Sequence, residues 1–236
     1  MKYEKYKQQL PYSYTLGITL TIELLKKRPK DVLDIYFHSS FNGESKDIIK
    51  KIAKENNINV TNNDKIFNIL SQKENVYCIG VFKKYSSSID NIKNHVVLVN
   101  PSNAGNLGTI IRSACGFDFR DIVIIKPAVD VFDPKTVRAS MGALFNINFS
   151  LFDSFSDYER TNDHNYYPFM LKAKTKLQET KFISPYSLIF GNEATGLPDS
   201  FLDYNSVIIP HNKLIDSLNL EVATSIALFY ASFNSK

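Results

Sequence analysis

The chain has 236 residues, a length that allows one large domain or two modest ones. Hydrophobic residues make up 44% of the sequence and charged residues 22%, which permits a packed core and argues against global disorder. The net charge of +4 suits a polyanionic partner, and equally a lysine-rich surface that keeps a protein in solution. No apolar run approaches 18 residues and no secretion signal opens the sequence, so we expect a cytoplasmic protein without a membrane span.

Cysteine and histidine usage gives no sign of a disulfide framework or a metal site. The sequence has two cysteines, Cys78 and Cys115, and both lie in apolar surroundings, so we interpret them as reduced. The four histidines are scattered and lack the spacing of metal ligands. We therefore expect no metal.

Residues 1–85 are predicted to form a small α/β module. Apolar side chains recur at helical spacing within residues 47–55, which indicates a helix. Three short segments rich in apolar and β-branched residues are predicted to be strands, namely residues 32–37, 58–60 and 76–81. The polar residues 86–94 then indicate a linker.

In residues 95–236, predicted strands alternate with helices, which is typical of a parallel sheet with helices on both faces. Helices are expected from about residue 107 to 117 and from 218 to 233, where apolar residues share one face. Four short apolar runs are predicted to be strands, namely residues 95–99, 122–125, 187–190 and 207–209. Ligands of such sheets bind beyond the carboxyl ends of the strands, so we expect a site in the loops that leave them.

The first segment of interest, residues 100–112, follows the strand at 95–99. Gly105 and Gly108 permit a tight turn and a close approach to a helix N-terminus, where free N–H groups attract anions. The segment contains neither a dinucleotide-binding glycine fingerprint nor a P-loop. Arg112, off the apolar face of the helix, is either a solvated residue or a functional one, and its place beyond this turn favours a function.

The second segment, residues 188–198, runs from a strand into Gly-Asn-Glu and so places an amide and a carboxylate at the strand end. An ordinary polar turn is the simpler interpretation of that sequence. The third segment, residues 208–219, ends where the last helix opens, and Asp216 or Ser217 can cap this helix. Capping does not explain Asn219, because asparagine is a mediocre helix former.

In order and spacing, the three segments resemble the signature motifs of the SpoU/TrmH family, which belongs to the SPOUT class of RNA methyltransferases. The matching stretches are residues 106–112 (Asn-Leu-Gly-Thr-Ile-Ile-Arg), residues 190–197 (Phe-Gly-Asn-Glu-Ala-Thr-Gly-Leu), and Ile-Pro at 209–210 with Ser-Leu-Asn at 217–219. Residues 138–143 (Arg-Ala-Ser-Met-Gly-Ala) match a further stretch of the family. Residues 1–85 are similar, more loosely, to the ribosomal-protein-like RNA-binding domain of the family.

The resemblance implies an α/β fold in which residues 95–236 form a parallel-sheet SPOUT domain with a C-terminal trefoil knot, preceded by a small α/β RNA-binding domain at 1–85. It implies a homodimer that transfers a methyl group from S-adenosylmethionine to a ribose 2′-hydroxyl of tRNA or rRNA. Carried over by position, the cofactor would be lined by Gly191, Ile209 and Leu218. The catalytic group would be Asn106, Arg112, Glu193, Ser217 and Asn219.

We interpret Arg112 as a clamp on an RNA phosphate and a stabiliser of the developing alkoxide, because a guanidinium with a pKa above ~12 is a poor general base. Glu193 and Asn219 would then position the loops and the arginine. Two departures from the family are a loop at 211–215 without glycine and Asn100 in place of a common aspartate. The alternatives are a SPOUT enzyme that methylates a base, a non-catalytic RNA-binding protein of the same fold, and an oxidoreductase, which the missing glycine fingerprint disfavours.

Overall fold

The structure is a computed structural model that describes residues 3–71 and 75–234. The chain forms two compact units, one made of residues 1–85 with 130–146 and the other of residues 86–129 with 147–236. The chain first passes from one unit to the other after Tyr85. Residues 130–146 depart from the domains expected from the sequence, because they belong to the first unit and interrupt the second.

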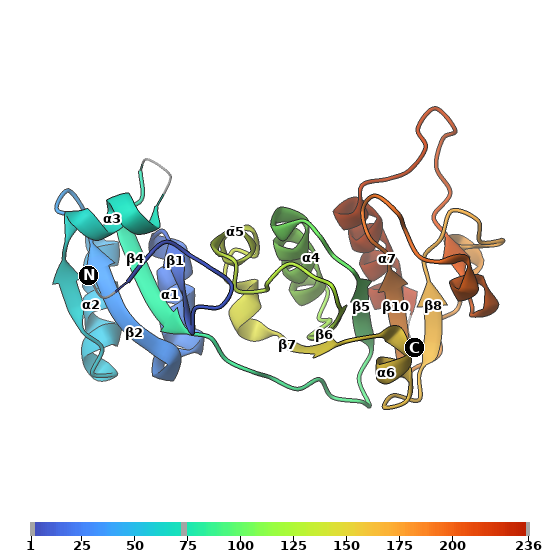
Figure 1. The fold of residues 1–236 in the computed structure, drawn as a ribbon, viewed down its shortest axis with the longest axis horizontal. Helices are drawn as coiled ribbons and strands as arrows, with labels where there is room; N and C mark the ends of the chain where they lie inside the picture. Colours follow the sequence, from blue (N-terminus) through green and yellow to red (C-terminus); the bar gives the residue numbers. More distant parts are fainter. Residues whose placement is uncertain (1–2, 72–74, 235–236) are drawn as a thin grey trace. The chain divides into compact units, whose positions relative to one another are not determined.

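The first unit contains a mixed sheet with the strand order β1-β4-β2-β3 (Figure 1). Strands β1 and β2 are antiparallel to β4, and β3 is parallel to β2. Its elements are β1 (Tyr12–Leu16), α1 (Ile18–Lys27), η1 (Pro29–Asp31), β2 (Val32–Phe37), α2 (Glu44–Glu55), β3 (Val60–Asn62), α3 (Asp64–Leu70), β4 (Cys78–Lys83), α5 (Pro134–Ala139) and η2 (Ala143–Asn146). The sequence predicted β2, α2 and, each displaced by two residues, β3 and β4, whereas β1, α1 and α3 were missed.

Residues 130–146 are held in the first unit by hydrogen bonds and by close packing. The Ser13 hydroxyl of β1 donates to the Phe132 carbonyl at 2.6 Å, and Val137 of α5 is fully buried. Gly142 has a φ of +89°, and a Cβ placed there would lie 2.8 Å from the Cβ of Glu23. Only glycine fits so close to Glu23. Packing within the first unit therefore explains why the stretch at 138–143 carries a glycine.

The second unit contains a parallel sheet with the strand order β7-β6-β5-β10-β8 (Figure 1). Its elements are β5 (His95–Val99), α4 (Ala104–Gly116), β6 (Asp121–Ile125), β7 (Asn148–Phe152), α6 (Phe155–Glu159), β8 (Asn165–Pro168), β9 (Thr175–Lys176), η3 (Leu177–Glu179), β10 (Tyr186–Phe190), η4 (Asp199–Asp203), β11 (Val207–Ile208) and α7 (Leu220–Asn234). The parallel sheet predicted from the sequence is confirmed. The strand predicted at 207–209 is not part of it, because β11 pairs with β9 in a separate two-stranded sheet.

Both faces of the five-stranded sheet are buried. On one face, Val97, Val123 and Ile189 belong to a core cluster that includes Tyr158 of α6. Successive strand residues point to opposite faces, so the buried Val96 and its neighbours pack on the other face, under α4 and α7. No helix within the described residues is both long and apolar enough to cross a membrane.

Helices α4 and α7 lie side by side and run in the same direction (Figure 1). The Ser225 hydroxyl donates to the Ser113 hydroxyl at 2.8 Å, and the ring centroids of Phe117 and Phe229 are 6.0 Å apart. Helix α4 begins at Ala104, three residues earlier than expected from the sequence, because the Asn103 side chain caps its first turn. This start brings residues 104–106 into the helix.

Candidate functional site

The first and second segments meet because their strands are neighbours. Strand β10 pairs in parallel with β5, with Phe190 opposite Leu98, so both strands end at the same edge of the sheet. Beyond that edge, the Asn192 side-chain amide donates to the Asn100 carbonyl at 2.7 Å. Asn100 has a φ of 53°, a conformation that asparagine tolerates better than most residues. The amide predicted at the strand end therefore joins the two segments.

Glu193 binds the first segment through both of its carboxylate oxygens. Oε2 accepts from the Ser102 N–H at 3.2 Å and from the Ser102 hydroxyl at 2.8 Å. Oε1 accepts from the Asn103 N–H and from the Asn106 side-chain amide, each at 3.3 Å. Desolvation raises the pKa of Glu193, but hydrogen bonds from its own backbone, Ser102 and Asn103 outweigh it and lower the pKa below the usual value. The ionised side chain of Glu193 therefore holds the start of α4 in place through these hydrogen bonds.

The second segment folds back on itself at Gly191. A Cβ at this position would lie 2.3 Å from the carbonyl carbon of Gly196 and 2.5 Å from the Leu197 nitrogen, so no side chain fits. The Gly196 N–H donates to the Asn192 carbonyl at 2.9 Å, and the Asn192 side-chain oxygen accepts from the Ala194 N–H at 2.8 Å. Because Gly191 has no side chain, the backbone of this turn can pack against Gly196 and Leu197. The turn lines the cavity described next.

A cavity of about 260 Å³ lies at the strand ends, and we call it the strand-end cavity. The second and third segments form most of its wall, together with the chain that follows β8, and the first segment is joined to it through Glu193. Its lining consists of Phe169, Met170, Leu171, Phe190, Gly191, Asn192, Glu193, Ala194, Thr195, Gly196, Val207, Ile208, Ile209, His211, Ser217, Leu218, Leu220 and Ala223. The predicted cofactor residues Gly191, Ile209 and Leu218 are all among them, as are Glu193 and Ser217.

The other three predicted site residues lie outside this lining. Asn106 is joined to the cavity through Glu193. The Asn219 carbonyl accepts from the Ala223 N–H at 2.9 Å and so closes the first turn of α7. Arg112 is exposed on α4, and its side chain makes no hydrogen bond or ion pair within residues 3–71 and 75–234. The structure therefore brings five of the eight predicted residues to the cavity and leaves Arg112 with a free guanidinium.

The chemistry of the lining suits a flat organic ligand with polar edges. Phe169 and Phe190 stack with their ring centroids 4.7 Å apart and, with Leu218, give apolar walls. The glycines at 191 and 196 leave backbone groups accessible for hydrogen bonds. In the part of the chain that the structure describes, no group of three or more His, Cys, Asp or Glu side chains is arranged to hold a metal ion.

Several residues of the site were missed by the sequence analysis. Asn103 and Ser102 carry hydrogen bonds that order the first segment. Asn103 could have been found, since an asparagine before a glycine-containing helix start is a capping signal. Phe169 and Met170 gave no such signal, because the short strand β8 before them ends in a proline and was not predicted.

Family comparison places the chain with known methyltransferases. The profile of the SpoU rRNA Methylase family matches residues 93–229, more than half of the chain, and the chain belongs to this family. A 23S rRNA (uridine(2479)-2′-O)-methyltransferase of Streptomyces viridochromogenes is 31% identical over 147 residues, which span 58% of this chain and 51% of that protein. The chain thus spans about half the length of this relative.

Solved structures share the fold over 94% of this chain in one case and 60% in another. An S-adenosylmethionine-bound rRNA methyltransferase of Sinorhizobium meliloti superposes with a TM-score of 0.78 at 24% identity, covering 94% of this chain and 87% of that one. A protein from a study of 2′-OH methylation of C/U34 on tRNA has a TM-score of 0.56 at 27% identity, covering 60% of this chain and 95% of that one. The first likeness supports both units of the fold, each of which it covers at least in part.

Proposed function

We propose that this chain transfers a methyl group from S-adenosylmethionine to a ribose 2′-hydroxyl of RNA. The observation that carries the proposal is the convergence of the second and third segments on the strand-end cavity, with Glu193 holding the first segment beside it, in a member of the SpoU family. Of the proteins described above, one is named for 2′-O methylation of rRNA and one comes from a study of 2′-OH methylation of tRNA. For this chain the substrate class is RNA, with tRNA and rRNA as the two candidates.

The residues that line the strand-end cavity match the chemical groups of S-adenosylmethionine. The stacked Phe169 and Phe190 and the side chain of Leu218 provide an apolar wall for the adenine ring, while the backbone at Gly191 and Ile209 lies at the cavity surface. When bound there, S-adenosylmethionine supplies a methyl group on a positively charged sulfur, which is a good leaving group. Glu193, with both oxygens hydrogen-bonded by the first segment, holds the second segment in place beside it.

Transfer to a hydroxyl requires an in-line approach at about 3–3.5 Å and loss of the hydroxyl proton. Arg112 offers the only arginine side chain of the three segments, and its free guanidinium can bind an RNA phosphate bidentately and stabilise the developing negative charge. The adjacent phosphate, rather than the arginine, accepts the proton. Ser217 at the cavity wall and Asn219 at the start of α7 orient the third segment toward the same place.

The path of the chain after β10 is consistent with the trefoil knot of the family. Strand β10 lies inside the sheet, between β5 and β8. From Gly191 the chain leaves the sheet, lines the cavity again through β11 in the separate sheet, and reaches it once more at Ser217. A chain threaded in this way surrounds its ligand with backbone from three directions.

The first unit supplies RNA affinity and contributes no chemistry. Lys26, Lys27, Lys50 and Lys51 are exposed on α1 and α2, where they can neutralise phosphates. Lys46 differs, because its ammonium donates to the Phe41 carbonyl at 2.7 Å. The RNA contact is therefore assigned to the four exposed lysines.

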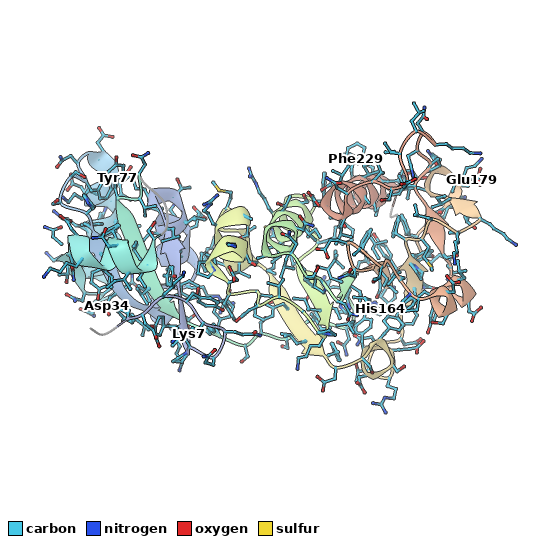
Figure 2. The ribbon with its side chains drawn as sticks, turned by 45° about the horizontal axis from the view of Figure 1, so that its top comes forward. Lys7, Asp34, Tyr77, His164, Glu179 and Phe229 are labelled. Atoms are coloured by element: carbon cyan, nitrogen blue, oxygen red, sulfur yellow. The ribbon has the colours of Figure 1, made fainter. Side chains whose placement is uncertain are left out.

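The protein acts as a homodimer in which α7 contributes to the interface. Its side chains Val222, Ile226, Phe229 and Phe233 form an exposed apolar stripe, with exposed fractions of 44%, 38%, 54% and 69%. Figure 2 shows Phe229 projecting from this helix. A second copy that covers the stripe should bury more than about 1,000 Å² in total.

Comparing RNA from a strain that lacks the gene with RNA from its parent tests this function. One 2′-O-methyl site should be absent from the mutant and restored by the wild-type gene. Restoration by an Arg112→Ala gene would contradict the role of the arginine. Loss of a base methylation instead of a ribose methylation would favour the base-methylating alternative.

A further inference from the structure

Glu221 is a charged residue that neither the cavity nor the proposed chemistry uses. It is the second residue of α7, and its Oε2 atom is buried without a hydrogen-bond partner among the described residues. A buried carboxylate oxygen without a donor costs free energy. We therefore expect this oxygen to gain a hydrogen-bond donor when nearby side chains rearrange.

The packing of α7 on α4 shows what Glu221 faces. Ser113 contacts Ser225, and Phe117 contacts Phe229 four residues further along both helices, which fixes a parallel register. One turn earlier, the same register places Glu221 beside Thr109 of α4. Leu220 and Ala223 line the strand-end cavity, whereas Glu221 is absent from its lining. Glu221 is thus placed toward α4 and away from the cofactor site.

Arg112 lies on the neighbouring helix three residues beyond Thr109, about 4.5 Å further along the axis. Side chains of a helix lean toward its N-terminus, so Arg112 leans toward the turn that contains Thr109. Its guanidinium is exposed and makes no hydrogen bond or ion pair within the described part of the chain. An unpartnered guanidinium and an unpartnered carboxylate oxygen therefore lie on successive turns of two packed helices.

We propose that Glu221 is a positioning residue for Arg112, whose guanidinium it binds after rotation of the two side chains and aims at the RNA. The planar guanidinium matches a carboxylate with two parallel hydrogen bonds, which restricts its orientation. This inference rests on the proposed function, because that function assigns Arg112 to methyl transfer. The simple alternative is that Glu221 only offsets the positive end of the α7 dipole.

A double-mutant cycle in single-turnover methyl transfer separates these two roles. With saturating RNA and cofactor, Arg112→Ala is expected to slow transfer about 10²–10³-fold. Glu221→Gln should slow it about tenfold or more while leaving the affinity for S-adenosylmethionine unchanged, and it should have no further effect when Arg112 is already alanine. The matched control is Glu44→Gln, which removes an exposed acid from the first turn of α2 and should leave the rate unchanged.

The pair also has a spectroscopic signature that does not depend on activity. The chain has five arginines, so the arginine Nε–H region of a nitrogen-15 spectrum is simple, and Arg112→Lys assigns the signal of Arg112. In the wild type this proton should exchange slowly with water, and in Glu221→Gln it should exchange at the rate of a solvated arginine. Glu44→Gln should leave the signal in place.

The two measurements distinguish failure of this inference from failure of the proposed function. Equal rates for Glu221→Gln and Glu44→Gln, or equal effects of Glu221→Gln with and without Arg112, would overturn the positioning role. An unchanged Arg112 signal in Glu221→Gln would overturn it as well. If the wild-type protein methylates no RNA, the proposed function fails, while the exchange rate still decides whether the pair exists.

Discussion

Replacing Gly191 with alanine tests whether the turn of the second segment builds the cofactor site. The new Cβ would lie 2.3 Å from the carbonyl carbon of Gly196, whereas ordinary contacts begin at 3.4 Å. The two backbone stretches must therefore separate by about 1.1 Å, the difference between these distances. The turn at Ala194 and Thr195 is exposed, so we expect it to move while the core stays intact.

The magnitude follows from the hydrogen bonds that this movement breaks. The bond from the Gly196 N–H to the Asn192 carbonyl, 2.9 Å long, would stretch beyond hydrogen-bond range, and the bond from Asn192 to the Asn100 carbonyl would be strained. One lost and one strained bond, together about 1–2 kcal/mol, with overpacking of about 1–2 kcal/mol, give about 2–4 kcal/mol. Because the affected loop lines the cavity, this free-energy cost should lower the affinity for the cofactor about 30- to 700-fold.

Calorimetry with S-adenosylmethionine measures the effect, and thermal unfolding shows whether each variant is folded. The matched control is Gly116→Ala at the end of α4, where a Cβ would meet nothing within 4 Å. That variant should bind the cofactor as the wild type does. If folded Gly191→Ala binds within threefold of the wild type, the turn at Gly191 does not form the cofactor site.

Three further predictions concern stability, RNA binding and assembly. Desolvation lowers the pKa of His95 to about 4, below the unfolded value of about 6.5, so its stabilising contribution is present above pH 6.5 and lost on acidification. Denaturant unfolding should show about 2 kcal/mol lost between pH 7 and 5, and less in His95→Asn; equal pH dependence in both would contradict the assignment. Replacing Lys50 and Lys51 with glutamate should weaken RNA binding and reduce the slope of log affinity against log salt concentration by about 2. Cofactor affinity is the control and should not change. An unchanged slope would show that the two lysines do not contact the RNA. Light scattering should show a dimer that Phe229→Glu dissociates, and a wild-type monomer at micromolar concentration would refute the assembly.

Much of the second unit could be predicted because its strands are short apolar runs buried on both faces. Strands β5 and β10 were found at or within one residue of their observed bounds for this reason. The order of the three segments then predicted that they meet at strand ends. The second and third segments line the cavity, and the first is joined to the second through Asn192 and Glu193. The strand β11 was assigned to the wrong sheet, since two apolar residues do not specify which strand they pair with.

The first unit was harder to predict because its tertiary contacts override local pattern. Strand β1 carries Ser13 and Thr15, polar residues that are nonetheless fully buried, so its apolar alternation is hidden. Ser13 is satisfied by Phe132, more than one hundred residues away in the segment that interrupts the second unit. Nothing local in residues 130–146 reveals that association, whereas Gly142 in retrospect marks the close approach to Glu23.

The most direct test of the proposed function is the position of the transferred methyl group. The purified protein would be incubated with S-adenosylmethionine carrying a trideuterated methyl group and with RNA from a strain that lacks the gene. After digestion to nucleosides, mass spectrometry separates the base from the ribose of each labelled product. We predict that the label remains with the ribose and that Arg112→Ala yields little labelled product. Label on the base, or none on any nucleoside with folded protein that binds the cofactor, would contradict 2′-O-methyl transfer.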